Sequence, residues 1–253
     1  MIRLLSLETA TDRGSFCLWS DEETGGAPLE LAARVEDCPA GQPHAETLLP
    51  LLRQALDDTG WRLPELDAII FDEGPGMFTG LRVSAALAQG LAVASDKPVI
   101  GISSLETLAE SAFVRTGLHR VLTLLDARMN QIYAAAWTRD VNGDWRELIS
   151  PCLVNPGELD ALADALWHDA SDHGEAMAVA GTALDEYPVA ASWCAAHALQ
   201  DAGVRSPQAA ALAALGARRL ARGQVQDPAQ AIPVYVRDRV ALTTAERAAG
   251  QLL

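Results

Sequence analysis

The chain has 253 residues with a formal net charge of −15 at pH 7, and 49% of the residues are hydrophobic, which is enough for a sizeable core. The acidic balance disfavours direct binding of the isolated chain to a polyanion such as RNA, and no apolar run reaches the ~18 residues that a membrane span needs. The N-terminal residues lack the long apolar segment of a secretion signal, so we expect a cytoplasmic protein that does not associate with a membrane.

The first half of the chain predicts three strands followed by alternating helices and strands. Apolar and alternating runs indicate the strands, and apolar residues spaced by three and four indicate the helices. The predicted elements are strands at 2–8, 15–20 and 29–35, a helix at 45–59, a strand at 68–71, a helix at 79–94 and a strand at 99–102.

The second half repeats this order. Its predicted elements are strands at 121–125, 132–137 and 145–151, a helix at 157–168, a strand at 176–180 and a helix at 207–222. Two copies of a β-β-β-α-β-α unit predict an α/β fold made by duplication. We expect an N-terminal domain over 1–103, a C-terminal domain over 104–232 and a tail over 233–253, with the helix at 207–222 packing back on the first domain.

A glycine-rich turn links the strand at 68–71 to the helix at 79–94. Gly74, Pro75 and Gly76 fix a tight bend, and Thr79 is placed to cap the helix that follows. A glycine turn before a helix can also bind phosphate, but the Gly-Lys-Ser/Thr ending of a P-loop is absent. A tight strand–helix turn and an anion site both remain open from the residues alone.

Several segments contain sequence motifs that are typical of one family. They are Gly-Pro-Gly-x-Phe-Thr-Gly-x-Arg at 74–82 with Gln-Gly-Leu-Ala at 89–92, Leu-Leu-Ser-Leu-Glu-Thr-Ala-Thr at 4–11, His-Ala-Glu-Thr-Leu-Leu-Pro at 44–50, the segment 98–106, Leu-Asp-Ala-Arg at 125–128 and Pro-Val-Tyr-Val-Arg at 233–237. In these segments the chain resembles the TsaB family of bacterial tRNA threonylcarbamoyladenosine biosynthesis proteins. The resemblance implies a two-domain fold of the actin/Hsp70/sugar-kinase class, each domain being RNase H-like.

The resemblance also implies a function. Members of this family are expected to be non-catalytic, activating subunits that bind a TsaD-type catalytic subunit and, with it, a TsaE-type ATPase. The complex modifies the adenosine next to the tRNA anticodon, so this chain is expected to contact tRNA only as part of the complex. When the chain is alone, a homodimer is expected. The alternative is an independent small-molecule kinase or hydrolase of the same superfold.

Two turns are candidates for facing a nucleotide, because in the superfold each domain offers one hairpin turn to the phosphates. They contain Glu8, Thr9 and Thr11 in the first half and Asp126 and Arg128 in the second. The other interpretation is that the threonine hydroxyls satisfy a tight turn and that Asp126 pairs with Arg128 within a hairpin. We expect no cofactor, and a nucleotide only as a weak alternative at the subunit interface.

The metal site of the catalytic relative is not expected here. By resemblance, the TsaD-type subunit carries two histidines spaced i, i+4 where this chain has Ser104 and Leu108. Leucine cannot ligate a cation, and Ser104 is expected to cap the helix that begins there. The chain is therefore expected to have neither a metal centre nor catalytic residues.

The partner surface is expected on the helices at 45–59 and 79–94. We expect Val83, Leu87 and Leu91 to pack on the sheet, which leaves the row of small residues at 85, 88, 90 and 92 for a closely approaching partner. The alternative is that the small residues are core too and that both helices are fully covered by the chain's own sheet and tail. The predicted interface residues are His44, Leu48, Leu52, Gly76, Phe78, Thr79, Arg82, Ala85, Ala88, Gln89 and Ala92.

Overall fold

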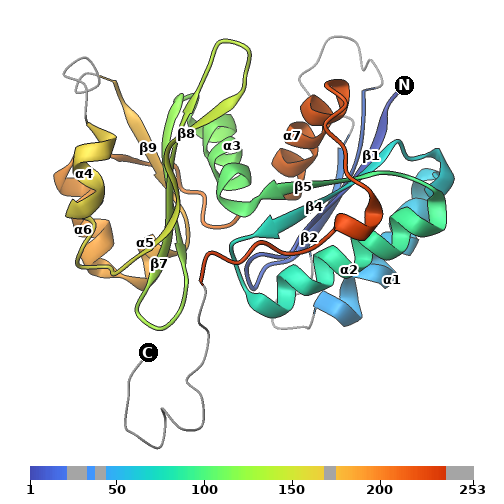
Figure 1. Cartoon of the computed structure of the whole chain (residues 1–253), viewed down its shortest axis with the longest axis horizontal. Coiled ribbons are helices and arrows are strands. Elements are labelled where there is room, and N and C mark those ends of the chain that lie inside the picture. The colour runs from blue at the N-terminus through green and yellow to red at the C-terminus, as the bar shows by residue number, and fades with distance from the viewer. Residues whose placement is uncertain (22–32, 38–43, 168–174, 238–253) are drawn as a thin grey trace, which may run out of the picture.

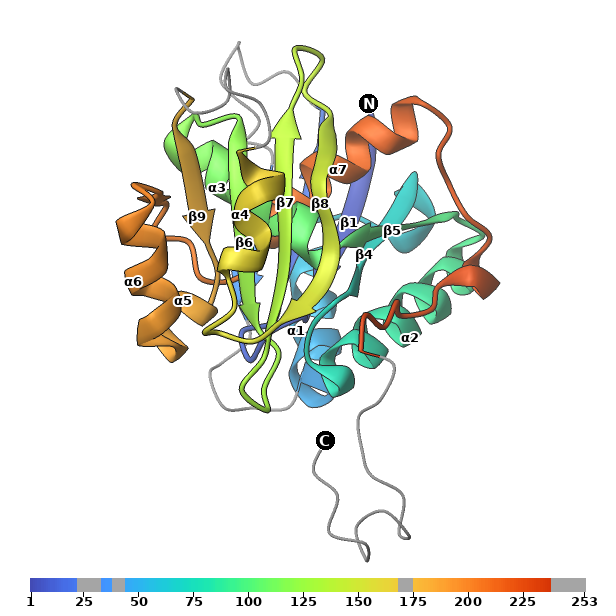
Figure 2. The same cartoon turned by 60° about the vertical axis from the view of Figure 1, so that its left-hand side comes forward.

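Two five-stranded sheets, each covered by helices, form the two lobes of the protein (Figures 1 and 2). The structure is a computed structural model that describes residues 1–21, 33–37, 44–167 and 175–237. The first sheet consists of β1 (Arg3–Glu8), β2 (Ser15–Ser20), β3 (Ala33–Asp37), β4 (Ala68–Gly74) and β5 (Val99–Ser103). The second consists of β6 (Arg120–Asp126), β7 (Ile132–Arg139), β8 (Trp145–Val154), β9 (Met177–Ala180) and β10 (Gln200–Asp201).

The two sheets have the same topology. Their strand orders are β3-β2-β1-β4-β5 and β8-β7-β6-β9-β10. In each sheet the first three strands form an antiparallel meander, the fourth pairs in parallel with the first, and the fifth pairs in parallel with the fourth. The predicted duplicated α/β fold is confirmed.

Helices cover the sheets on both faces. They are α1 (His44–Thr59), the 3-10 helix η2 (Leu63–Glu65), α2 (Phe78–Ser95), α3 (Ser104–Thr116), α4 (Asp160–Leu166), α5 (Ala183–Glu186), α6 (Pro188–Ala196), α7 (Ala209–Ala221) and the 3-10 helix η4 (Pro228–Gln230). Among the described residues, none of the helices has the length and apolar character to cross a bilayer.

Successive side chains along a strand point to opposite faces of the sheet, so each face packs against different helices. Leu5 and Leu7 of β1 belong to the core under α1 and α2, whereas Leu4 faces the opposite side and packs with α7. The second sheet packs α4 and α6 on one face and α3 on the other. Successive strand residues point to opposite faces, so each sheet contributes to two separate cores.

The lobes exchange one helix each. Helix α3 follows the last strand of the first sheet but packs on the second sheet, where Leu105 and Leu108 join its core. Helix α7 follows the last strand of the second sheet but packs on the first, through Leu212 and Ala213. Both helices therefore lie between the two sheets (Figure 1).

Two predicted helix caps are wrong. Helix α2 begins at Phe78 with Met77 as its N-cap, so Thr79 is already helical. Helix α3 begins at Ser104 with Ser103 as its N-cap. An N-cap residue needs an extended backbone, and Met77 and Ser103 have it, with ψ of 120° and 132°. Parts of two other predictions, residues 29–32 of the third strand and His168 at a helix end, lie outside the described residues.

Candidate functional site

The glycine turn is a site of close backbone packing. A side chain at Gly76 would collide with the backbone of Ala10, and one at Gly80 would collide with the carbonyl of Thr9. The amide of Met77 donates to the carbonyl of Ala10 at 2.7 Å. The glycines therefore bring the start of α2 against the β1–β2 turn, which supports the interpretation as a tight strand–helix turn.

A buried polar cluster fixes the β1–β2 turn from below. The amide of Thr9 donates to Asp72 at 3.1 Å, and the Thr9 hydroxyl donates to the carbonyl of Gly80 at 2.8 Å. Glu8 accepts the amide of Ala10 at 2.8 Å. Burial raises the pKa of Asp72 to about 7, although hydrogen bonds from Ser84 and Thr9 act in the opposite direction.

The prediction that Glu8 and Thr9 face a nucleotide is wrong for this structure. Both side chains are fully buried beneath the turn, and neither lines the cleft between the lobes. Their polar groups instead tie β1, β4 and α2 together, because a buried polar group is stable only with a hydrogen-bond partner. The threonine hydroxyls form hydrogen bonds that stabilise the tight turn, which is the other interpretation given for these residues.

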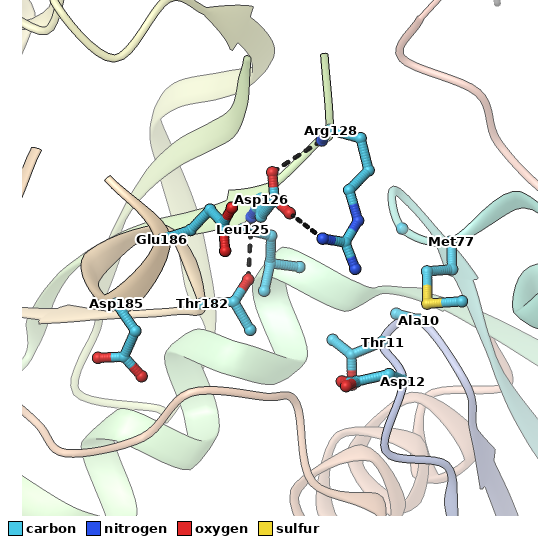
Figure 3. Close-up of a pocket in the computed structure, with 11 residues that line it drawn as sticks. Ala10, Thr11, Asp12, Met77, Leu125, Asp126, Arg128, Thr182, Asp185 and Glu186 are labelled. Carbon is cyan, nitrogen blue, oxygen red and sulfur yellow. Dashed lines mark hydrogen bonds and ion pairs between the residues drawn. The ribbon is translucent and has the colours of Figure 1, made fainter. Parts of the chain in front are cut away.

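The other candidate residues meet in a cleft of about 290 Å³ between the lobes (Figure 3). Thr11 lies on one wall, while Asp126 and Arg128 lie on the opposite one. The lining residues are Ala10, Thr11, Asp12, Gly76, Met77, Leu125, Asp126, Arg128, Thr182, Asp185 and Glu186. Among these lining residues there are four carboxylates and one cation, a balance that opposes a polyphosphate.

Asp126 forms its ion pair and hydrogen bonds with residues of its own lobe. Its carboxylate pairs with the Arg128 guanidinium at 3.0 Å, and its amide donates to the Thr182 hydroxyl at 2.9 Å (Figure 3). The carboxylate also accepts a hydrogen bond from the Tyr187 hydroxyl at 2.7 Å. Burial, followed by this bond to Asp126, raises the pKa of Tyr187 to about 12. Arg128, Met129 and Asn130 all have positive φ, between 55° and 61°. Asp126 thus stabilises a tight left-handed hairpin turn, as the ion-pair interpretation states.

Ser104 and Leu108, the positions at which no metal ligands are expected, lie inside the protein. Ser104 and Leu108 are both fully buried, and Leu108 belongs to the core of the second sheet. Among the described residues, no group of three or more histidine, cysteine, aspartate or glutamate side chains is placed to hold a metal ion.

The predicted interface residues divide into two groups. Phe78, Thr79, Arg82 and Gln89 are exposed, and Gly76 is partly exposed in the turn. The buried ones are His44, Leu48, Leu52, Ala85, Ala88 and Ala92. His44 lies under the β1–β2 turn with Nε2 2.9 Å from the carbonyl of Thr11, and the others pack in the core of the first sheet.

The prediction that the alanine row is free is therefore wrong. Ala85, Ala88 and Ala92 face the sheet because their small side chains let α2 approach it closely, whereas Val83, Leu87 and Leu91 are only partly buried at the edge. The exposed residues of α2 are instead Phe78, Thr79, Arg82, Ala86, Gln89, Gly90, Val93 and Ala94.

The α1–α2 face, which we define as the exposed sides of helices α1 and α2, carries apolar groups. Leu49 is 47% exposed, Phe78 42% and Val93 67%. Nothing lies within 4 Å of where a side chain at Gly90 would begin, so the backbone of α2 is open to close approach there. Exposed apolar groups gathered on one face are typical of a surface that binds another protein.

An apolar groove continues this face at the end of α1. It has a volume of about 610 Å³ and lies between α1, η2 and α2. Leu49, Leu56, Trp61, Leu63 and Leu91 supply its walls, and Arg53 and Arg62 stand among its polar lining residues.

A segment that contains the start of the predicted tail at 233 crosses between the lobes. This strap, residues 231–237, runs from η4 along α2 toward the β6–β7 hairpin (Figure 1). The amide of Val234 donates to the carbonyl of Glu73 at 2.7 Å, and Arg237 donates to Gln131 at 2.7 Å. Tyr235 contacts the ring of Phe78, with centroids 5.4 Å apart. Its sequence has no strand or helix periodicity, so only the resemblance at 233–237 singled it out.

Comparison with known proteins agrees with this geometry. Residues 39–245 match the family model described as TsaD, tRNA N6-adenosine threonylcarbamoyltransferase. The tRNA threonylcarbamoyladenosine biosynthesis protein TsaB of Escherichia coli K12 is 33% identical over 95% of this chain and 96% of its own length. The TsaB protein of Haemophilus influenzae is 38% identical over 61% of this chain and 65% of its own length.

Two solved structures share the fold. YeaZ from Pseudomonas aeruginosa has a TM-score of 0.73 and 31% identity, covering 93% of this chain and all of that one. A protein described as uncharacterized, with similarity to the peptidase YeaZ from the same organism, has a TM-score of 0.75 and 31% identity over 94% of this chain and all of the other. On these sequence and structural matches, the chain belongs to the TsaB family, within the wider group that the TsaD family model describes.

Proposed function

We propose that this chain is a non-catalytic, activating subunit in the biosynthesis of threonylcarbamoyladenosine in tRNA. It binds a TsaD-type catalytic subunit through the α1–α2 face and, together with that subunit, a TsaE-type ATPase. The names of its relatives support the pathway. The same surface makes a homodimer when the catalytic subunit is absent, because the two helices of one copy fit those of another.

The exposed α1–α2 face is the observation that carries this proposal. Leu49 and Val93 stand in solvent on neighbouring helices, and the open backbone at Gly90 lies between exposed Ala86 and Ala94 on α2. Small residues spaced by four on an exposed helix allow another helix to approach closely, and the apolar groups beside them supply the area that is buried. A partner with the same fold offers two equivalent helices.

The site chemistry supports a role without catalysis. The carboxylate of Asp126 is engaged by Arg128 and Tyr187, and the cleft around it is acidic. The sequence also contains neither His-Glu-x-x-His nor Gly-x-Ser-x-Gly, so a peptidase mechanism lacks its usual residues.

The test is to place a charged side chain at the open point of the face. The full-length chain and a TsaD-type subunit are mixed, and their affinity is measured by calorimetry for the wild type, for Gly90→Arg and for the control Ala195→Arg on the exposed side of α6. We expect Gly90→Arg to weaken binding at least 100-fold and the control to bind like the wild type. Equal affinity of all three proteins would contradict the proposal.

A further inference from the structure

Arg82 is held in place on the first turns of α2. Its guanidinium carbon lies 3.8 Å from the centroid of the Phe78 ring, and its Nε donates to the Tyr235 hydroxyl at 3.2 Å. A cation over an aromatic face is attracted by the ring quadrupole, and the hydrogen bond fixes the rotation of the planar group. The side chain of Arg82 is therefore ordered although it is exposed.

The strap keeps Tyr235 in position from both sides. Before it, Ala231 is buried in the core of the first sheet, and the amide of Val234 is bonded to Glu73. After it, Val236 packs against the core of the second sheet, and Arg237 donates to Gln131. The backbone around Tyr235 is thus anchored in both lobes.

Arg82 also differs from most arginines of the described structure in its partners. Nine others form ion pairs with carboxylates: Arg3, Arg62, Arg128, Arg139, Arg146, Arg205, Arg218, Arg219 and Arg222. No described carboxylate lies within ion-pair distance of Arg82. Its terminal amino groups are thus open to a bidentate acceptor from outside.

We propose that Arg82 is an anchor of the partner surface and binds a carboxylate of the TsaD-type subunit, while Tyr235 of the strap positions it. The proposal rests on the proposed function and assigns the chemistry of one point of that interface. Arginine and tyrosine are among the residues that most often dominate binding energy, and a side chain ordered beforehand loses little entropy on binding.

A protein carboxylate fits better than an RNA phosphate. Arg82 adjoins the exposed ring of Phe78 and the apolar α1–α2 face, which suits a protein surface. On the other side of the glycine turn, Asp12 and Asp126 line the acidic cleft, which repels a polyanion.

The experiment measures the affinity of the full-length chain for the TsaD-type subunit by calorimetry, using variants of both residues. We expect Arg82→Glu to weaken binding about 30-fold, Arg82→Lys about 10-fold because lysine cannot bind a carboxylate in the planar bidentate manner, and Tyr235→Phe about threefold. Arg115→Glu, the same charge change at an exposed position of α3, serves as the matched control and should bind like the wild type. The wild-type affinity should fall with added salt. Arg82→Lys should keep most of that dependence because lysine has the same charge, whereas in Arg82→Glu the contribution of this position should reverse, because salt screens the repulsion between two carboxylates.

The outcomes separate this proposal from the previous one. If Gly90→Arg abolishes binding but Arg82→Glu and Tyr235→Phe do not change it, the proposed role of Arg82 is refuted. The proposal that the α1–α2 face binds the partner is then still supported. If the wild type does not bind the TsaD-type subunit, both proposals fail. If Arg82→Glu weakens only the binding of tRNA to the assembled complex, with the affinity between the proteins unchanged, the carboxylate assignment is overturned in favour of phosphate. Tyr235→Phe removes one hydroxyl and keeps the ring, so it tests the positioning role even if Arg82→Glu folds poorly.

Discussion

Gly216 of α7 lies directly against the side chain of Ile70 of β4, with no room for a methyl group between them. This contact joins a helix that follows the second sheet to the central strands of the first. We expect Gly216→Ala to lower the free energy of unfolding by ~1–3 kcal/mol, because the added carbon overpacks the core. Urea denaturation of the isolated chain measures this change.

Gly90→Ala is the matched control for that substitution. It makes the same change in another helix, but nothing lies within 4 Å of the added carbon. Removing a glycine from an exposed helix interior should raise the free energy of unfolding by up to ~1 kcal/mol. The two variants should thus differ in sign, and a Gly216→Ala protein as stable as the wild type would show that α7 does not pack this closely.

The buried Asp72 should make stability depend on pH. Its pKa rises from 3.8 in the unfolded chain to about 7 in the folded protein, so the folded state binds the proton more tightly. The contribution of Asp72 is fully present below about pH 4 and is lost as pH rises through 7, with a steepest slope of roughly 1.4 kcal/mol per pH unit. Asp72→Asn should remove this component while keeping an acceptor for the amide of Thr9.

The measurement is the difference in unfolding free energy between wild type and Asp72→Asn from pH 4.5 to 8. That difference isolates Asp72 from Glu73 and Glu106, whose pKa values burial also raises. We expect the unfolding free energy of Asp72→Asn to rise relative to that of the wild type as pH increases. Parallel curves would mean that Asp72 ionises normally in the folded protein.

Ala86 and Ala88 of α2 should respond oppositely to the same substitution. Ala88 is fully buried against the sheet, so Ala88→Arg puts a charge into the core and should cost at least ~3 kcal/mol of stability. Ala86 is exposed, and Ala86→Arg should stay within about 0.5 kcal/mol of the wild type. Thermal unfolding of the isolated chain compares them. A folded, stable Ala88→Arg protein would restore the sequence-based orientation of the helix.

A chain limited to residues 1–103 should fail to fold cooperatively. Without α7, one face of the first sheet loses its cover, and Leu4, Ile70, Ile100 and Ile102 become exposed together. Amide NMR spectra of this fragment should lack the dispersion of a folded domain. Well-dispersed spectra with a cooperative thermal transition would show that the first lobe is autonomous.

The order of elements could be predicted because hydrophobic periodicity records which residues face a core. The orientation of α2 could not, since both of its rows are apolar or small: leucines at 87 and 91 compete with alanines at 88 and 92. In the structure the alanines at 88 and 92 are buried and the leucines at 87 and 91 are only partly buried. The packing of the helix at 207–222 back on the first domain was expected, although periodicity alone says that a face is buried and not against which sheet.

The candidate site was predictable only in part. Thr11, Asp126 and Arg128 do meet in one cleft, since equivalent turns of the two repeats face each other. Glu8 and Thr9 lie in the same turn but point inward, and a turn sequence does not record the direction of each side chain. The role of Tyr235 depends on contacts with residues more than 150 positions away, which local patterns cannot reveal.

The exchange of α3 and α7 has a consequence during translation. The strands of the first sheet leave the ribosome roughly 120 residues before α7 is complete. At about 5–20 residues per second, the apolar side of that sheet waits on the order of 6–24 s for its covering helix. Nascent chains of this protein should therefore be clients of chaperones that shield apolar strands, and the first lobe acquires its native core only near the end of synthesis.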